Sequence, residues 1–306
     1  MKLKILLLTV LLVSGCSAAS TTAKSPALAP NSSGTALDNT PVFHLATFNQ
    51  EKAIGNELVL IDLSNISKGY FGVKYGGSNN KPKLQLTLPS GPIYTYNLTG
   101  ATDIFNLVET SGVYEITVYE NIEANRYGKI FKTSFAVEQD NEFDAFLYNN
   151  QYVNFDRDTK AVYIANDLVA NATSNLEKIR LIFDYIITEY DYDYAKAKTV
   201  AYNYIPDLDE IYQTKKGICF DYAALLAAML RTQDIPTRLE FGYVQENYHA
   251  WVSVYTKETG WIDNFIHFEN ENWQIMDPTF ISQDPSNTKI KEFTTVSDNY
   301  QLKYIF

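Results

Sequence analysis

The sequence has few of the residues that most often carry side-chain chemistry: two cysteines and three histidines in 306 residues. Two cysteines allow at most one disulfide bond, so a disulfide framework is excluded and packing must hold the fold together. Basic residues are also scarce, with 25 Lys and Arg against 36 Asp and Glu and a formal net charge of −11. Nucleic acid is therefore not an expected partner, because neutralising its phosphates requires clustered Lys and Arg.

Long hydrophobic runs are missing as well, and the apolar run at the N-terminus is too short to span a bilayer. Lys2 and Lys4 precede the apolar residues 5–13, a pattern typical of an export signal. Residues 13–16 (VSGC) resemble the lipobox of bacterial lipoproteins, which implies cleavage after residue 15 and lipidation of Cys16. Ordinary signal cleavage near Ala19, which would discard Cys16, is the alternative.

Residues 16–40 are rich in Ala, Ser, Thr, Pro and Asn, a composition that predicts a flexible tether after a signal peptide at 1–15. Lipidation with several acyl chains would hold the protein on the extracytoplasmic face of a bacterial cell membrane. Cys219 would then have no disulfide partner in the chain. An exported protein that keeps one unpaired thiol invites a functional interpretation.

The chain is long enough for two domains, and 46% of it is apolar. Residues 41–140 contain seven short segments rich in β-formers, several of them alternating, and separated by turn signals such as Gly76-Gly77 and Ser90-Gly91. The segments are 57–63, 70–75, 82–88, 93–98, 103–109, 113–119 and 129–137. This spacing predicts a β-sandwich with an immunoglobulin-like architecture. It shows no catalytic constellation, so a spacer or a binding module is expected.

Residues 141–306 change to a mixed pattern of helices and strands. Ser174 and Glu177 form a capping box for a helix that ends at Tyr190. Cys219 follows Gly217 and begins an apolar run with helical spacing that stops at Arg231. Cys219 is thus expected in the first turn of a buried helix, where unpaired amides and the helix dipole favour a thiolate and lower the thiol pKa.

Two further residues could serve such a thiol. His249 lies in an alternating segment, residues 248–255 (YHAWVSVY), which predicts a strand. An imidazole there could accept the thiol proton and return it to a leaving group. Asp277 follows a second short strand and could orient the imidazole ring.

The motifs GICFDYA, YHAW and MDPT occur in this order and resemble those of the transglutaminase-like superfamily, over roughly residues 176–280. The resemblance implies a papain-type α+β domain, with a triad of Cys219, His249 and Asp277. In relatives an upstream aromatic residue often donates to the oxyanion. Here Tyr192 is the expected donor, and Tyr194 remains an alternative.

Simpler interpretations remain open. A lone cysteine is most often an inert core residue. His267 is expected to be structural, and Asp263 competes with Asp277 for the third position. Asp221 lies two positions after Cys219 on the same helix and is expected to interact with the dipole of the first turn rather than to catalyse.

The sequence therefore predicts an exported, lipid-anchored thiol enzyme that acts on amide or acyl bonds of a peptide or protein through a thioester. Hydrolysis (peptidase or deamidase) and amine transfer use the same residues, so the sequence does not choose between them. The predicted location on the cell surface suggests cell-wall or surface peptides as substrates. The alternative is a catalytically silent binding or scaffold lipoprotein with the same fold. No cofactor or metal is expected, because zinc, EF-hand and phosphate-loop spacings are missing from the sequence.

Overall fold

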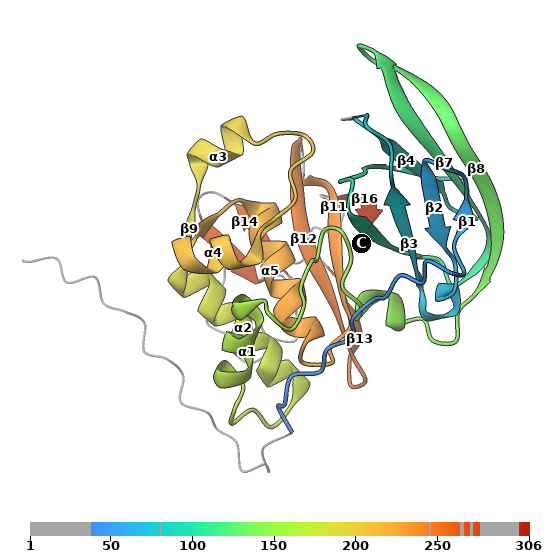
Figure 1. Ribbon diagram of the computed structural model, residues 1–306. Helices are drawn as coiled ribbons and strands as arrows, with labels where there is room; N and C mark the ends of the chain where they lie inside the picture. The colour runs from blue at the N-terminus through green and yellow to red at the C-terminus, as the bar shows by residue number, and fades with distance from the viewer. Residues whose placement is uncertain (1–37, 80, 245, 264–265, 270–271, 276–299) are drawn as a thin grey trace, which may run out of the picture. The chain divides into compact units, whose positions relative to one another are not determined.

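Two four-stranded antiparallel sheets form the N-terminal part of the protein (Figure 1). The computed structural model describes residues 38–79, 81–244, 246–263, 266–269, 272–275 and 300–306. The first sheet has the order β1 (Ile54–Gly55), β2 (Val59–Asp62), β3 (Tyr70–Tyr75) and β6 (Thr102–Asn106). The second has the order β5 (Ile93–Asn97), β4 (Lys83–Thr87), β7 (Ser111–Glu123) and β8 (Arg126–Glu138). All seven predicted strands are present, and the β-sandwich is confirmed.

Alternation along the strands explains the core of this sandwich. Leu84 and Leu86 of β4 lie opposite Val118 and Ile116 of β7, and all four are buried. They belong to one apolar cluster with residues of the first sheet, including Phe71. The tyrosines that alternate along β5 and β7 are packing residues, because Tyr94, Tyr96 and Tyr114 are buried.

The rest of the described chain is an α+β arrangement around helix α5 (Cys219–Arg231), as the sequence predicted (Figure 1). The other helices are α1 (Lys160–Leu168), α2 (Asn175–Glu189), α3 (Tyr194–Thr199) and α4 (Leu208–Thr214), with short 3₁₀ turns at Ile66–Lys68 and Asp144–Phe146. Helices α1, α2 and α4 pack against α5, and α5 also packs on strands β11 and β12. Every residue from Asp221 to Arg231 is buried, so the helix that begins with Cys219 is the centre of this region.

The sheet beside α5 is antiparallel, with the order β13-β12-β11-β16. Its strands are β11 (Thr237–Val244), β12 (Asn247–Thr256), β13 (Gly260–Ile262) and β16 (Tyr300–Ile305). Two pairs stand apart from it: parallel β9 (Asp191–Tyr192) and β10 (Lys216–Gly217), and antiparallel β14 (Ile266–Glu269) and β15 (Asn272–Ile275). The alternating segment that carries His249 is therefore a strand, as predicted.

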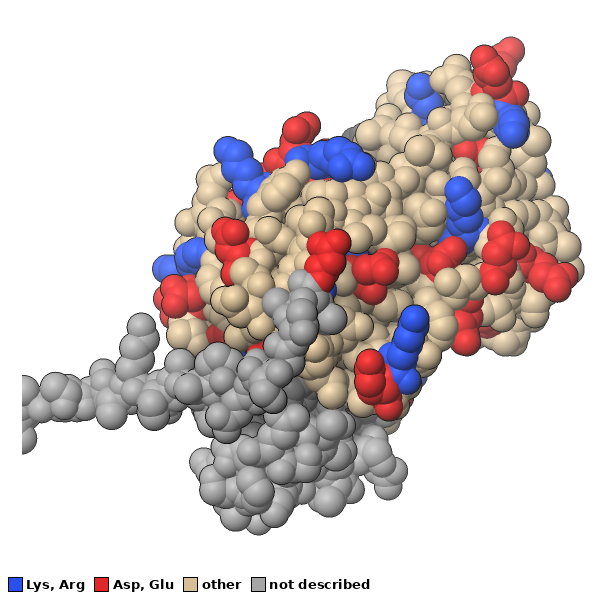
Figure 2. All heavy atoms as spheres, turned by 90° about the horizontal axis from the view of Figure 1, so that it is seen from below, with Lys and Arg blue, Asp and Glu red and all other residues tan. Residues whose placement is uncertain are grey.

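Thr35–Phe306 form one compact unit by their contacts, so the predicted boundary between residues 140 and 141 stays a prediction. The predicted signal peptide and most of the tether, including Cys16, lie outside the described residues. None of the helices in the described ranges is long and apolar enough to cross a membrane. On the face shown in Figure 2, acidic and basic side chains of the described residues are interspersed, and no broad basic area is seen.

Candidate active site

The backbone just before Cys219 is held in a tight turn. Gly217 has no room for a side chain, because a Cβ built there would lie 2.7 Å from the Asp221 Cβ. Ile218 is extended, with φ −101° and ψ 176°, and helix α5 starts at the next residue. Cys219 is therefore the first helical residue, so its thiol lies beside amides that have no partner within the helix.

Asp221 fixes this turn from inside the protein. It is fully buried, and its Oδ2 accepts a hydrogen bond from the Ile218 N–H at 2.8 Å. The same oxygen lies 2.7 Å from the Lys196 Nζ, and the Tyr204 hydroxyl donates to Oδ1 at 2.6 Å. The structure thus agrees that Asp221 serves the first turn rather than the chemistry. Its partners Lys196 and Tyr204 were not predicted.

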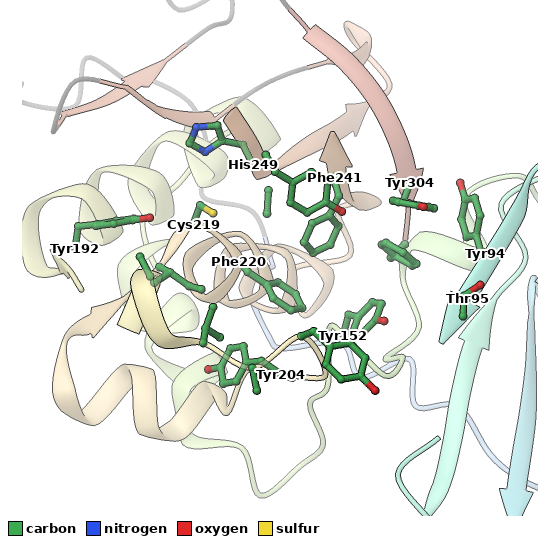
Figure 3. Close-up of a pocket in the computed structure, with 18 residues that line it drawn as sticks. Tyr94, Thr95, Tyr152, Tyr192, Tyr204, Cys219, Phe220, Phe241, His249 and Tyr304 are labelled. Atoms are coloured by element: carbon green, nitrogen blue, oxygen red, sulfur yellow. The ribbon is translucent and has the colours of Figure 1, made fainter. Parts of the chain in front are cut away.

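Cys219 and His249 line the same cleft, which has a volume of about 460 Å³. The half-buried thiol comes from the start of α5, and the imidazole comes from β12. The N–H of Ala250, the residue after His249, donates to the thiol. Figure 3 shows the sulfur, the imidazole and the Tyr192 ring at the same end of the cleft. The fold therefore brings together two of the three predicted triad residues.

The thiol pKa differs from the sequence prediction. Burial raises the pKa of the Cys219 thiol, and the charge of Asp221 adds to this effect. The N–H groups of Ala250, Phe220 and Cys219 lower the pKa but do not outweigh burial. The expected amides at the helix start are thus present, but the apolar walls of the cleft penalise the thiolate more strongly. The resting group is a protonated thiol.

Burial also lowers the pKa of the His249 imidazole, so the ring is neutral at pH 7. A neutral imidazole can accept a proton, which a charged one cannot. The resting pair is therefore thiol and imidazole rather than an ion pair. Chemistry here requires proton transfer to the imidazole as the sulfur attacks.

Tyr192 lies in the cleft beside the thiol, and its hydroxyl is hydrogen-bonded to the Cys219 backbone N–H. Burial raises the Tyr192 pKa to about 12, and an electrostatic interaction with the Cys219 side chain adds to this effect. The hydroxyl therefore keeps its proton and can donate a hydrogen bond at neutral pH. Tyr194, the alternative donor, is 48% exposed and does not line the cleft.

The other candidates are placed as follows. Asp277 lies outside the described residues, between the described ranges 272–275 and 300–306. Asp263 is exposed, directly after β13. His267 is on β14, opposite Gln274 of β15, and only its backbone is described. No group of three or more His, Cys, Asp or Glu able to hold a metal ion is found among the residues that the structure describes.

One feature of the site was missed from the sequence: the sandwich lines the cleft. Tyr94 and Thr95 of β5 lie opposite residues of α5 and β11, as Figure 3 shows. The composition held a hint, because 23 of the 306 residues are tyrosine, but alternation along a strand does not reveal which part of the chain a tyrosine will meet.

Comparison with known proteins finds one family whose profile covers the region around the cleft. A sequence profile described as "Transglutaminase-like superfamily" matches residues 162–265, which include Cys219 and His249. No curated protein matches the sequence.

Solved structures with some similarity include a proposed cysteine protease from Cytophaga hutchinsonii, with 14% identity, a TM-score of 0.38, and coverage of 83% of this chain and 73% of that one. Red sea bream transglutaminase has 14% identity and a TM-score of 0.28, over 69% of this chain and 48% of its own. A proposed protease from Parabacteroides distasonis has 17% identity and a TM-score of 0.29, over 46% of this chain and 31% of its own.

Proposed function

We propose that the protein is a thiol enzyme acting on amide or related acyl bonds, and the match of residues 162–265 to the transglutaminase-like superfamily supports this proposal. The observation that carries the proposal is the shared cleft, in which a thiol at a helix start lies with a neutral imidazole and a tyrosine hydroxyl. These are the groups needed for nucleophilic attack, proton transfer and stabilisation of an oxyanion.

In the proposed reaction, the Cys219 Sγ attacks the acyl carbon while His249 takes the thiol proton. The carbonyl oxygen becomes an oxyanion, for which the N–H groups at the start of α5 and the Tyr192 hydroxyl are the candidate donors. The C–N bond then breaks, and His249 returns its proton to the departing amine. The remaining thioester is resolved by water, which gives hydrolysis, or by a second amine, which gives transfer.

Asp277 is the proposed third member, acting through the other imidazole nitrogen to keep the ring oriented. Its support is the sequence, where it follows the segment that forms β15. It is a positioning residue in this scheme, because it would touch the imidazole and not the substrate. Asp277→Ala should therefore lower kcat with little effect on KM.

We also propose export and lipidation at Cys16, which would place the cleft outside the bacterial cell membrane and make cell-wall or surface peptides accessible. The support is the N-terminal sequence alone. Intact-mass analysis of the membrane fraction should show a chain that begins at an acylated Cys16. An unmodified protein released to the medium would refute the anchor but leave the proposed chemistry standing.

The test of the enzyme is a covalent one. The full chain is incubated with activated acyl donors, namely p-nitrophenyl esters and glutamine- or alanine-containing peptides, and its intact mass is followed after a rapid acid quench. The expected result is an added acyl group on Cys219 that is lost in Cys219→Ala. The alternative, a silent scaffold with the same fold, predicts no adduct with the peptides, and with the esters only the slow acylation that an ordinary thiol or amine shows.

A further inference from the structure

The candidate active site continues into an aromatic cleft that extends well beyond the thiol. Its lining includes seven tyrosines and three phenylalanines: Tyr94, Tyr152, Tyr192, Tyr202, Tyr204, Tyr248, Tyr304, Phe220, Phe241 and Phe306. Several are only partly buried, so their ring faces are available to a ligand. A cleft of this size with aromatic walls is typical of sites that bind small molecules or side chains.

The rings form a continuous path away from Cys219. Phe220, the next residue on α5, lies 4.8 Å from Phe241 of β11 and 5.6 Å from Tyr152, measured between ring centroids. Tyr152 is 4.8 Å from Phe306, and Phe306 is 5.6 Å from Tyr94 of the sandwich. The aromatic path therefore joins the nucleophile to strand β5 (Figure 3).

Strand β5 is held in place at the end of this path. The Tyr94 hydroxyl accepts a hydrogen bond from the Ile305 N–H at 3.2 Å, and its ring meets Tyr304 edge-on at 5.1 Å. Thr95, the next residue on this edge strand, is exposed and lines the cleft. The sandwich therefore contributes a wall of the cleft.

The cleft carries no formal charge of its own at neutral pH. Among its described lining residues none is Asp, Glu, Lys or Arg. Its imidazole is neutral, and burial raises the pKa of Tyr94, Tyr152 and Tyr248, so these hydroxyls keep their protons. A charged side chain entering it would lose water and meet no opposite charge among the described lining residues, which is unfavourable. An aromatic side chain would instead gain stacking partners and lose apolar surface to water.

We propose that this cleft is the specificity subsite of the enzyme: it takes an aromatic or large apolar side chain next to the acyl group that Cys219 attacks, and Thr95 of the sandwich forms its far wall. This inference rests on the proposed function, because the subsite is defined by its position next to the acyl group that Cys219 attacks. It also narrows the substrate class, because peptides with carboxylates or ammonium groups at this position would be poor acyl donors.

Binding tests the subsite without requiring turnover. The full-length Cys219→Ala variant is titrated with N-acetyl-Gly-X-Gly amides in which X is Phe, Asp or Lys, and Kd is followed by NMR. The Phe peptide should bind at least about tenfold more tightly than either charged peptide, since apolar side chains are commonly discriminated by factors of this size. Equal affinities, or no binding of the Phe peptide, would overturn the proposal.

A second pair of variants tests the wall from the sandwich. Thr95→Asp should weaken the Phe peptide several-fold and improve the Lys peptide, and Thr95→Lys should instead improve the Asp peptide. The matched control makes the same two changes at Thr102, an exposed threonine on edge strand β6 that does not line the cleft, and should leave all three affinities unchanged. If the Kd values of the three peptides do not change with the charge introduced at Thr95, the sandwich does not form a wall of the subsite.

The outcome separates this inference from the enzyme itself. A Phe preference in binding together with no acyl adduct in the wild-type protein would leave the subsite and refute the proposed chemistry. An acyl adduct on Cys219 without any preference among the three peptides would support the proposed chemistry and refute the subsite.

Discussion

The β-sandwich and the region around α5 use buried charge in different ways. In the sandwich, Asp62 and Asp103 are the buried carboxylates, and both accept hydrogen bonds from nearby turn groups: Asp62 from the Asn49 and Ser64 N–H groups, Asp103 from the Thr99 N–H. They satisfy the backbone where strands end. Such groups explain a fold and need no further function.

Around α5, buried ionisable residues instead lie on the elements that carry or neighbour the proposed catalytic residues. Asp221 lies at the start of the helix and Arg231 at its end, both fully buried. Glu240 is 3% exposed on β11 and accepts from the Trp251 Nε1 at 2.7 Å and the Ser253 Oγ at 2.8 Å, on the strand that carries His249. Buried charges are costly unless hydrogen bonds satisfy them, so these partners are expected to contribute strongly to the stability of the region.

The largest effect should come from the imidazole. His249→Gln removes the proposed base, and kcat/KM should fall by roughly 10²–10⁴ while the free energy of unfolding changes by less than about 1 kcal/mol. In the wild type, burial lowers the His249 pKa, so the acidic fall in kcat/KM should lie below pH 6.5, the ordinary value. A pH–rate profile measures the fall in kcat/KM, and a denaturant titration measures the free energy of unfolding. A fall in kcat/KM that begins well above pH 6.5 would contradict a neutral imidazole in the resting enzyme.

Next in size is Arg231, whose guanidinium donates to the backbone carbonyls of Thr237, Tyr148 and Phe306 at 2.7–3.0 Å. Arg231→Met leaves these buried carbonyls without their donors, and the free energy of unfolding should fall by about 3–5 kcal/mol. The control Arg126→Met, at an exposed side chain in the sandwich, should change it by less than about 0.5 kcal/mol. Equal losses of unfolding free energy in Arg231→Met and Arg126→Met would show that the buried charge near α5 contributes no more to stability than an exposed one in the sandwich.

Glu240 predicts a dependence on pH. Burial raises its pKa from 4.5 to about 7, so the folded state binds a proton that the unfolded state releases. The stability that this proton provides is complete below pH 4.5 and is lost as pH rises through 7. Glu240→Gln should therefore leave unfolding at pH 4 nearly unchanged and stabilise the protein at pH 9 by about 3 kcal/mol.

Thermal and denaturant unfolding at both pH values, with Glu138→Gln on exposed β8 as the control, measure this effect. A variant that is less stable than the wild type at pH 9 would show that the carboxylate is satisfied there and that burial does not dominate.

The smallest effect belongs to the sandwich. Asp62→Asn keeps the shape of the side chain but turns an amide NH₂ toward a backbone N–H donor, which should cost about 1–2 kcal/mol. Acylation of Cys219 should be unchanged in this variant. A parallel loss of acylation at temperatures where the variant is folded would mean that the sandwich controls the thiol directly.

Much of the fold could be predicted from local sequence patterns. The sandwich strands were predictable because their residues alternate and Gly-containing turns separate them, and α5 because its apolar spacing begins at Cys219 and stops at Arg231. Strand β1 was missed, since two residues give no pattern. The pairing of β16 with β11 was also missed, because the two strands are distant in the chain and such a pairing leaves no local pattern in the sequence.

For the candidate site, the order of motifs predicted the meeting of Cys219 and His249, and the i, i+2 spacing placed Asp221 in the first turn of α5, where the structure has it. The direction of the thiol pKa was wrong, because the helix start is visible in the sequence while the walls that desolvate the sulfur come from other segments. Glu240 had no signal, since an isolated acid in an apolar strand looks the same whether it is buried or exposed. Tyr94 and Thr95 were missed for a similar reason: the sequence does not say which surface of the sandwich the cysteine helix will face.

The most direct measurement is the intact mass of the full-length protein after quenching with an acyl donor. We expect one acyl group on Cys219 that accumulates in the wild type, forms far more slowly in His249→Gln, and is missing in Cys219→Ala. Acylation that is spread over other nucleophiles, or that proceeds equally in His249→Gln, would contradict a thiol served by that imidazole.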